Sequence, residues 1–214
     1  MFVADWMTKK VHTVSPDDTV SAAALLMKEK GIKHVPVIKR EKIRGILSDL
    51  DIKEYLPART KSLDLHDMHF SLSHTKVKEV MKTEVIVTGP DTPIEEAAMI
   101  MYDRNIGCLP VVEKGGLTGI ISDRDIFRVL VDISGVRHQG HRIYLSVEDR
   151  AGSVNDVLVL TRKHGFSVQS ILTSYKGVKK GYKDLVVRLK GSGNFNAMKA
   201  ELAATYIGVR IKKG

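Results

Sequence analysis

The stretch GILSDLD at residues 45–51 returns as GIISDRD at residues 119–125, and this repetition decides the fold. Five of the seven positions are identical, and the same offset of 74 residues holds outside the two phrases without a gap. Identical residues at this offset are Val3 and Val77, Met7 and Met81, Pro16 and Pro90, Ala23 and Ala97, Met27 and Met101, and Pro36 and Pro110. The chain therefore contains one unit of roughly 50 residues twice, at 3–52 and 77–126.

Each copy predicts the element order strand, helix, strand, strand, helix. One face of the first predicted helix carries Val20, Ala23, Ala24 and Met27, and Gly31 is expected to end that helix. The apolar strands HVPVI and CLPVV follow, then IRGIL and LTGII, and then a helix that begins near Asp51 or Asp125. A unit of this size buries too little surface alone, so the two copies are expected to pack together as a pseudo-twofold α+β pair.

The beginning of each copy gives more detailed expectations. Short extended segments are predicted at 10–14 and 84–87, each before a turn that contains Pro and Asp. Asp18 is the expected N-cap of the first helix. In the second copy, Thr92 is the expected N-cap, Pro93 the first helical residue and Glu95 the carboxylate of a capping box.

The repeated phrase has two chemical interpretations. In S-x-x-D before an apolar helix, Ser48 and Ser122 can be N-caps whose capping boxes are closed by Asp51 and Asp125. A carboxylate at a helix start can instead accept hydrogen bonds from both hydroxyls of a ribose, while the serine and the free N–H groups of the first turn hold phosphate. The two roles compete, because a carboxylate bound to its own cap is less free to bind ribose.

Composition indicates a globular protein. Of its 214 residues, 43% are hydrophobic and 28% charged, and the sequence contains neither a run of 18 apolar residues nor a secretory signal. We therefore expect a cytoplasmic protein with no membrane partner. Cys108 is the single cysteine, so an internal disulfide is excluded. Its apolar neighbours (IGCLPVV) predict that it is a buried small hydrophobic residue.

Several kinds of catalytic and metal site are not expected. The sequence has no P-loop, no nucleophile elbow and no standard metal-ligand spacing, so no catalytic residue, no metal and no enzymatic activity are predicted. His66, His69 and His74 match no zinc pattern and lack a partner cysteine, so a solvated linker is preferred there.

The excess positive charge lies in the last third of the chain. Residues 1–140 carry 20 Lys and Arg against 20 Asp and Glu, whereas residues 141–214 carry 14 against 5. This change indicates a domain boundary near Gly140. Strands are predicted at 143–147, 166–175, 182–190 and 209–212, and helices at 154–163 and 194–206. The order β, α, β, β, α, β is that of a ferredoxin-like sandwich.

With its HVPV and CLPV strands and its two G-h-h-S-x-x-D endings, the repeat resembles a tandem pair of CBS domains. This resemblance implies CBS units at 1–60 and 77–134, a linker at 61–76, and binding of an adenine nucleotide (AMP, ADP, ATP or a relative such as S-adenosylmethionine) between the halves. The implied contacts around the ribose are Ser48, Asp51, Ser122 and Asp125.

The same resemblance implies that Lys33, His34 and Arg124 neutralise phosphate. The counterparts of Lys33 and His34 at the 74-residue offset are Gly107 and Cys108, and that of Arg124 is Leu50. Two related but unequal sites are therefore expected, with the more anionic ligand on the side of Lys33 and His34. A partly buried strand histidine without a ligand is the alternative for His34.

The β-α-β-β-α-β order, together with DRAGSV at 149–154, resembles the ACT domain, a regulatory fold that binds amino acids or similar metabolites, often across a dimer interface. The resemblance implies an ACT domain at 141–214 with ligand contacts at Asp149, Gly152 and Ser167. Ala151 stands where the family commonly has proline. A dimer-forming unit without a ligand is the alternative.

Two CBS units followed by one ACT unit resemble the acetoin-utilisation protein B group of bacteria. The preferred hypothesis is a homodimeric, non-catalytic metabolic sensor that acts on an unknown regulated protein. The alternative is a nucleic-acid-associated regulator that uses the basic C-terminal domain. Lys176, Lys179, Lys180 and Lys183 surround one predicted hairpin, but no aromatic stacking set or recognition helix accompanies them, so a solvated surface is preferred.

Overall fold

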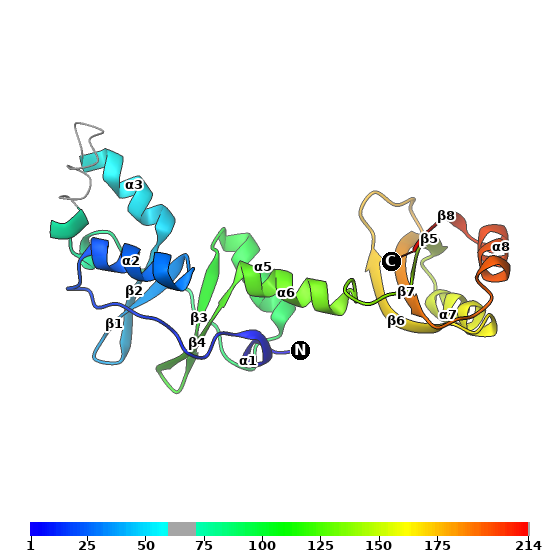
Figure 1. Ribbon diagram of the computed structural model, residues 1–214, viewed down its shortest axis with the longest axis horizontal. Coiled ribbons are helices and arrows are strands. Elements are labelled where there is room, and N and C mark those ends of the chain that lie inside the picture. The colour runs from blue at the N-terminus through cyan, green and yellow to red at the C-terminus, as the bar shows by residue number, and fades with distance from the viewer. Residues whose placement is uncertain (60–71, 214) are drawn as a thin grey trace. The chain divides into compact units, whose positions relative to one another are not determined.

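The structure is a computed structural model that describes residues 1–59 and 72–213. The chain forms two compact units, unit 1 (Met1–Phe127) and unit 2 (Arg128–Gly214) (Figure 1). Helix α6 (Asp123–Ile133) continues through the point at which the two units divide. Of the linker histidines, His66 and His69 lie outside the described residues.

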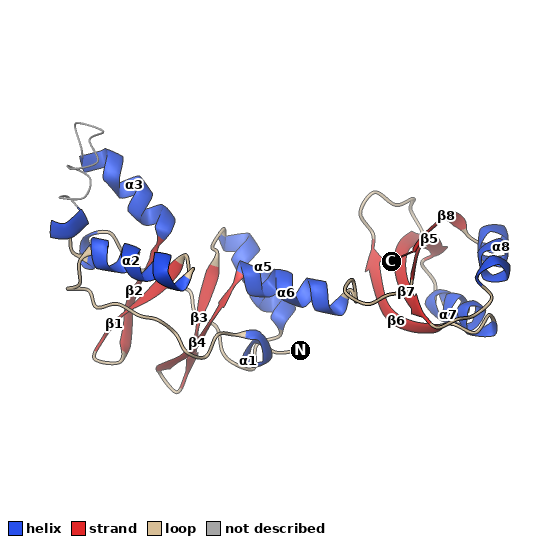
Figure 2. Ribbon diagram, viewed as in Figure 1, coloured by secondary structure: helices blue, strands red, loops and turns tan. Residues whose placement is uncertain are grey.

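Unit 1 contains the same set of elements twice, as the repeat predicts. Each copy has a helix, an antiparallel hairpin of two strands and a second helix (Figure 2). The first copy consists of α2 (Val20–Lys30), β1 (His34–Lys39), β2 (Lys42–Ser48) and α3 (Asp49–Arg59), and the second of α5 (Ile94–Arg104), β3 (Cys108–Glu113), β4 (Gly116–Ser122) and α6. Even the irregularity of the hairpins repeats, because the register shifts after Val37 in one and after Val111 in the other.

The extended segments predicted at 10–14 and 84–87 do not form strands. Val14 makes an isolated parallel bridge to Val37, and Thr88 makes the equivalent bridge to Val111. A parallel ladder extended from Val14 towards His12 would need the N–H of Pro36, which proline lacks. The ladder therefore stops at one bridge in each copy.

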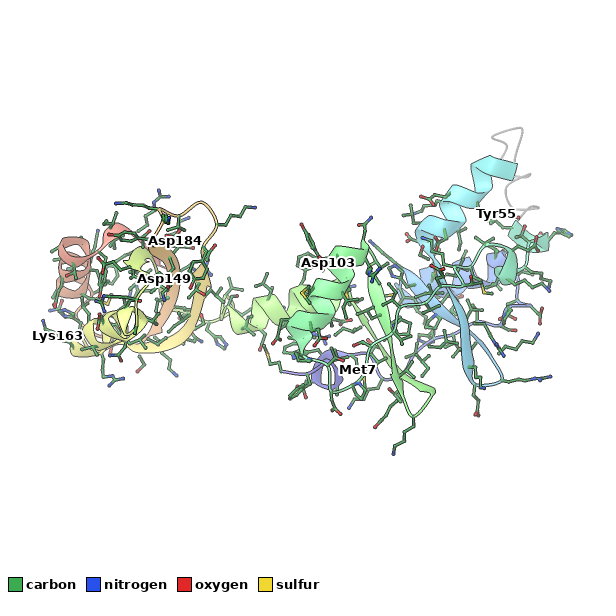
Figure 3. All side chains as sticks on the ribbon, turned by 180° about the vertical axis from the view of Figure 1, so that it is seen from behind. Met7, Tyr55, Asp103, Asp149, Lys163 and Asp184 are labelled. Atoms are coloured by element: carbon green, nitrogen blue, oxygen red, sulfur yellow. The ribbon has the colours of Figure 1, made fainter. Side chains whose placement is uncertain are left out.

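The first residues of the chain belong to the second copy in space. At the start of helix α1 (Val3–Trp6), the Val3 N–H donates a backbone hydrogen bond of 2.9 Å to the Thr92 carbonyl. Thr8 then forms a bridge with Ile120 of β4, and Met7 lies beside these strands (Figure 3).

The beginning of the second repeat makes the reciprocal contacts with the first copy. The Val77 N–H, at the start of the 3₁₀-helix η1 (Val77–Glu79), donates to the Asp18 carbonyl at 2.9 Å. Lys82 forms a bridge with Ile46 of β2. The lead-in segments of the two repeats are thus exchanged, and each completes the copy to which it does not belong in sequence.

The hydrophobic core repeats together with the elements. Buried pairs at the 74-residue offset are Val3 and Val77, Val20 and Ile94, Ala23 and Ala97, Met27 and Met101, Val35 and Leu109, Val37 and Val111, and Leu47 and Ile121. The Met and Ala face predicted for the first helix is therefore confirmed as core. Burial of each Val, Leu, Ile or Met side chain among them stabilises the fold by about 1.5–3 kcal/mol, and burial of each alanine by less.

The helix starts differ from the predicted caps. Thr19, not Asp18, caps α2, because its hydroxyl accepts a hydrogen bond from the Ala22 N–H at 3.2 Å. In the second copy Pro93 occupies the N-cap position, and the Thr92 hydroxyl accepts from the Gly89 N–H in the preceding turn instead. Each prediction was one residue too early, because the turn before the helix uses the polar side chain. The end predicted at Gly31 is confirmed by its left-handed φ of 63°.

Unit 2 has the element order predicted for a ferredoxin-like sandwich. Its elements are β5 (His141–Glu148), α7 (Ser153–Lys163), β6 (Ser167–Ser174), β7 (Tyr182–Lys190), α8 (Phe195–Thr205) and β8 (Ile207–Lys213). The four strands form one antiparallel sheet in the order β6-β7-β5-β8 (Figure 2). Both helices contribute to one core with this sheet, through Val157 and Leu160 of α7 and Met198 and Leu202 of α8.

Candidate functional site

The two repeated turns both form hydrogen bonds of a capping box. The Ser48 Oγ accepts from the Asp51 N–H at 3.1 Å, and Asp51 Oδ2 accepts from the Ser48 N–H at 2.8 Å. In the second copy, Asp125 Oδ2 accepts from the Ser122 N–H at 3.0 Å and from its hydroxyl at 2.7 Å. One oxygen of each aspartate is thus engaged by its own serine, as the capping interpretation predicts.

The second oxygen of Asp51 is also occupied. Lys82, from the exchanged lead-in, places its Nζ 2.9 Å from Asp51 Oδ1, and the Asp51 side chain is only 7% exposed. Burial acts to raise the pKa of Asp51, but the hydrogen bonds from Ser48 and Lys82 outweigh it and hold that pKa below its ordinary value. The residue equivalent to Lys82 in the other copy is Thr8, which has no charge to offer Asp125.

A cavity of unit 1 lies at the Ser122–Asp125 turn and is called here the Arg124 cavity. It has a volume of about 550 Å³. Polar and charged side chains around it are Thr8, Lys10, His12, Lys30, Lys33, His34, Ser122, Asp123, Arg124 and Asp125. Apolar side chains include Val11, Ile32, Cys108, Ile120 and Phe127. A space of this size, with an apolar wall and clustered polar groups, is suited to a nucleotide-sized ligand.

The structure brings Lys33, His34 and Arg124 to the same cavity, whereas the sequence predicted that they would serve two different sites. The cavity lies between the copies, so the start of β1 from the first copy meets the start of α6 from the second. Ser122 and Asp125 line this same space. Five of the seven predicted nucleotide contacts are therefore gathered around one cavity.

His34 occupies its position because Gly107 leaves room for it. A Cβ added to Gly107 would lie 2.8 Å from His34 Cε1. Burial lowers the pKa of His34, and this effect exceeds the opposing influence of Asp123 and Asp49, so the imidazole is uncharged at neutral pH. His34 can therefore donate or accept a hydrogen bond there, but its charge does not add to that of Lys33.

The smaller cavity, called here the Asp51 cavity, is the counterpart of the first at the 74-residue offset. It has a volume of about 170 Å³ and is lined by Ser48, Leu50, Asp51, Lys82, Glu84 and Gly107, among others. His34 and Cys108 line both cavities. Ser48 and Asp51, the remaining predicted contacts, are thus placed in a site that is narrower and more acidic.

Cys108 is buried, as the sequence predicts. Burial, assisted by the nearby Asp123 carboxylate, raises the pKa of its thiol to about 12. The thiol is therefore protonated at neutral pH and is a poor nucleophile.

Sequence reasoning did not identify the contribution of the lead-in segments and of α2 to the cavities. Lys10 and His12 approach from the first segment, and Lys30 stands at the end of α2. Their counterparts at the 74-residue offset are Glu84, Ile86 and Arg104. The first two positions therefore change chemical character between the copies, and this change was visible in the sequence. Only the structure, in which the lead-ins are exchanged, shows that each segment packs against the copy to which it does not belong in sequence.

The predicted ligand contacts of unit 2 are not gathered at one cavity. Asp149, in the turn between β5 and α7 (Figure 3), pairs with Lys183 at 3.0 Å. Gly152 has a φ of 82° at the N-cap of α7, a conformation that favours glycine. Ser167 is exposed at the start of β6. None of the three lines the cavity of about 360 Å³ formed by Ser146, Glu148, Arg150, Ser153, Asp156, Tyr182, Tyr206 and neighbouring residues.

The basic hairpin of unit 2 is partly neutralised. Lys183 is engaged by Asp149, and the Lys179 Nζ lies 5.4 Å from the centre of the Tyr182 ring.

Within residues 1–59 and 72–213, no group of three or more His, Cys, Asp or Glu is placed to hold a metal ion. No helix in the same residues combines the length and apolar character needed to cross a bilayer.

Comparison with known proteins finds a family and several relatives that match the repeat of unit 1. The model of the CBS domain family matches residues 3–58 and 77–132. The CBS domain-containing protein YhcV of Bacillus subtilis is 34% identical over 124 residues, which cover 58% of this chain and 81% of that protein. The chain spans less than half the length of two further curated relatives, 44% of one and 24% of the other.

Solved structures give the same result. A putative acetoin utilization protein from Vibrio cholerae has a TM-score of 0.54 at 31% identity and covers 64% of this chain and 95% of its own. The CBS domain pair of protein MJ0100, in complex with 5′-methylthioadenosine and S-adenosyl-L-methionine, has a TM-score of 0.53 at 25% identity, with coverages of 61% and 99%. The family match to this chain ends at residue 132 and does not reach the sheet of unit 2.

Proposed function

Because the chain belongs to the CBS domain family, we propose that it is a non-catalytic regulatory protein whose unit 1 binds an adenine nucleotide: AMP, ADP, ATP or S-adenosylmethionine. The observation that carries this proposal is the Arg124 cavity, where a helix start, a carboxylate and several cations meet in a space of about 550 Å³. The MJ0100 domain pair, a structural relative, binds two adenosine derivatives.

In this proposal Asp125 binds the ribose hydroxyls and Ser122 lies alongside. Arg124 and Lys33 face the phosphates, and His34 donates a hydrogen bond without adding charge. At the other turn Asp51 is held on both oxygens by Ser48 and Lys82, so a ribose there must compete with an ion pair whose carboxylate is buried. Ser48 and Asp51 form a second, weaker site, in which a ribose must first displace Lys82.

Unit 2 is proposed to be an ACT domain over 141–214. Its sheet order and the glycine turn at Gly152 support this assignment. Asp149, Gly152 and Ser167 are the proposed contacts for an amino acid or a similar metabolite, with a homodimer formed through these units. The likeness to the Vibrio cholerae protein supports a role in acetoin-type metabolic regulation in the cytoplasm, exerted on a protein partner that is still to be identified.

Thermal unfolding with a panel of ligands tests the nucleotide proposal. AMP, ADP, ATP and S-adenosylmethionine are each added to the wild type, to Asp125→Ala and to Asp51→Ala, with amino acids as a separate arm for unit 2. A ligand at about 100 times its Kd adds about 2.7 kcal/mol to the stability of the form that binds it. We expect wild type and Asp51→Ala to be stabilised and Asp125→Ala to lose most of the effect.

Two results would contradict the proposal in different ways. If none of the four compounds stabilises the wild type, unit 1 is not an adenine nucleotide sensor. If Asp125→Ala still responds and Asp51→Ala does not, nucleotide binds in the Asp51 cavity and our choice of cavity is wrong.

A further inference from the structure

The two cavities of unit 1 differ sharply in charge, although they are built from equivalent positions. Lys10, Lys30, Lys33 and Arg124 line the Arg124 cavity, against two carboxylates, Asp123 and Asp125. In the Asp51 cavity a single cation, Lys82, is outnumbered by Asp51 and Glu84. The difference comes from individual replacements at the 74-residue offset, in which Lys10 corresponds to Glu84 and Arg124 to Leu50.

Among the residues that the structure describes, none of the four cations of the Arg124 cavity forms a salt bridge with a carboxylate, although Lys33 is close enough to Asp49 to help lower the pKa of that carboxyl. Every ion pair recorded for the described residues involves other lysines and arginines or His164. All four cations are exposed at the edge of the cavity. Like charges gathered around one space repel one another, and an anion bound between them relieves that repulsion.

From this arrangement, and resting on the proposed function, we propose that the Arg124 cavity selects a nucleoside polyphosphate, a di- or triphosphate, over a nucleoside monophosphate and over S-adenosylmethionine. Arg124 can hold two phosphate oxygens with its planar guanidinium, while each lysine contributes a mobile positive charge. The further phosphate groups of ATP give these cations partners that AMP does not supply. The sulfonium of S-adenosylmethionine brings positive charge to the position that the phosphates of ATP would take.

The selectivity should depend on the number of cations, since no single one is buried or held in place. An exposed ion pair contributes about 0.2–1 kcal/mol, so each cation changes the affinity for ATP by roughly fivefold at most. Two removed together should change it by up to roughly 25-fold. Screening by salt should weaken the same contribution.

Isothermal titration of the full chain with ATP, AMP and S-adenosylmethionine, at about 50 mM and about 300 mM salt, tests this proposal. The double variant Lys10→Glu/Arg124→Leu gives these two positions the residues that their counterparts carry. Lys42→Glu is the matched control, because Lys42 is exposed at the start of β2, does not line the cavity and undergoes the same charge reversal. Thermal unfolding without ligand checks that each variant folds like the wild type.

We expect the wild type to bind ATP at least tenfold more tightly than AMP at low salt, and the ratio to fall as salt is added. In Lys10→Glu/Arg124→Leu the ratio should fall to within a few-fold of one, because the affinity for ATP falls more than the affinity for AMP, and Lys42→Glu should behave as the wild type. Equal or tighter binding of AMP or S-adenosylmethionine by the wild type would overturn the selectivity but leave the nucleotide proposal intact. If none of the three ligands binds, both proposals fail.

Discussion

The two copies in unit 1 share their elements, their hairpin bulges and their core positions, but they differ at the cavities that those elements form. In one copy the S-x-x-D aspartate is buried and tied to Lys82, beside a space of about 170 Å³. In the other copy Thr8 replaces Lys82, and the neighbouring space is about 550 Å³. The two copies keep the same scaffold, while a few side chains, most of them at exposed positions, distinguish the cavities beside the two turns.

The comparison also shows that a motif does not determine its own role. Both S-x-x-D turns form the hydrogen bonds of a cap. Part of what differs is supplied from elsewhere, by the exchanged lead-ins and by the residues at the start of each hairpin, and part by one position inside the motif, where Arg124 corresponds to Leu50. The predictions that follow exploit matched positions at the 74-residue offset, so each variant has its control in the same molecule.

The largest difference in stability is expected at a pair of buried strand glycines. A Cβ on Gly45 would lie 2.7 Å from the Lys82 carbonyl oxygen, which also accepts a backbone hydrogen bond from Ile46 and cannot move easily. The three atoms nearest to a Cβ on Gly119 would all belong to the Met7 side chain, which can change rotamer. Gly45→Ala should therefore lower the free energy of unfolding by about 2–3 kcal/mol and Gly119→Ala by about 1 kcal/mol, measured by urea unfolding.

Equal losses in the two glycine variants would show that the Lys82 backbone moves as readily as the Met7 side chain. The exchanged lead-ins would then be equally adaptable in both copies, and the structural contrast drawn here between them would be wrong.

A smaller difference is expected between the two aspartates. Asp51→Asn removes a buried charge-assisted contact with Lys82 and should cost about 1–2 kcal/mol at pH 7, more than Asp125→Asn does. Because the folded-state pKa of Asp51 is lowered, its contribution is fully present above the unfolded value of about 3.9 and is lost as the pH falls through the folded value. The gap between wild type and Asp51→Asn should therefore close below about pH 4.

Chemical unfolding at a series of pH values measures that gap. Lys82→Met serves as its control, since it removes the partner and leaves the carboxylate. A gap that stays constant down to strongly acidic pH would mean that packing, not ionisation, accounts for the effect of Asp51→Asn.

The smallest predicted effect lies at the hairpin tips. Glu41 has a φ of 62°, in the left-handed region, where its counterpart in the second copy is Gly115 at 82°. Glu41→Gly should raise the melting temperature by relieving about 1 kcal/mol of backbone strain, part of which is offset by the greater freedom of glycine in the unfolded chain. The reverse exchange, Gly115→Glu, should lower it, and calorimetry that finds the same sign for both would contradict this explanation.

Much of the fold could be predicted because the sequence of unit 1 is repeated and because both units have clear local periodicity. The Met and Ala helix face, Gly31 as a helix end, the two hairpins and the β-α-β-β-α-β order of unit 2 all depend on local periodicity, and the structure confirms them. The helix caps at Asp18 and Thr92 were displaced by one residue, because a side chain that can cap a helix can equally close the turn before it.

The site was less accessible to such reasoning. Ser122, Arg124 and Asp125 were identified from the repeated phrase, but their grouping with Lys33 and His34 depends on how two copies meet in space. Lys82, which engages Asp51, is remote from it in sequence and reaches it only through the exchange of lead-ins. Contacts of this kind have no periodicity, so a local pattern cannot reveal them.

The exchanged lead-ins also bear on how such a module could have arisen. Val3 is fully buried in the core of the second copy, and Val77 is fully buried in the core of the first. A single repeat therefore lacks part of its own interior and carries part of another's. An ancestor encoded by one copy would have needed a second identical chain to supply the missing segment, and joining two copies in one gene turned that intermolecular requirement into an internal one.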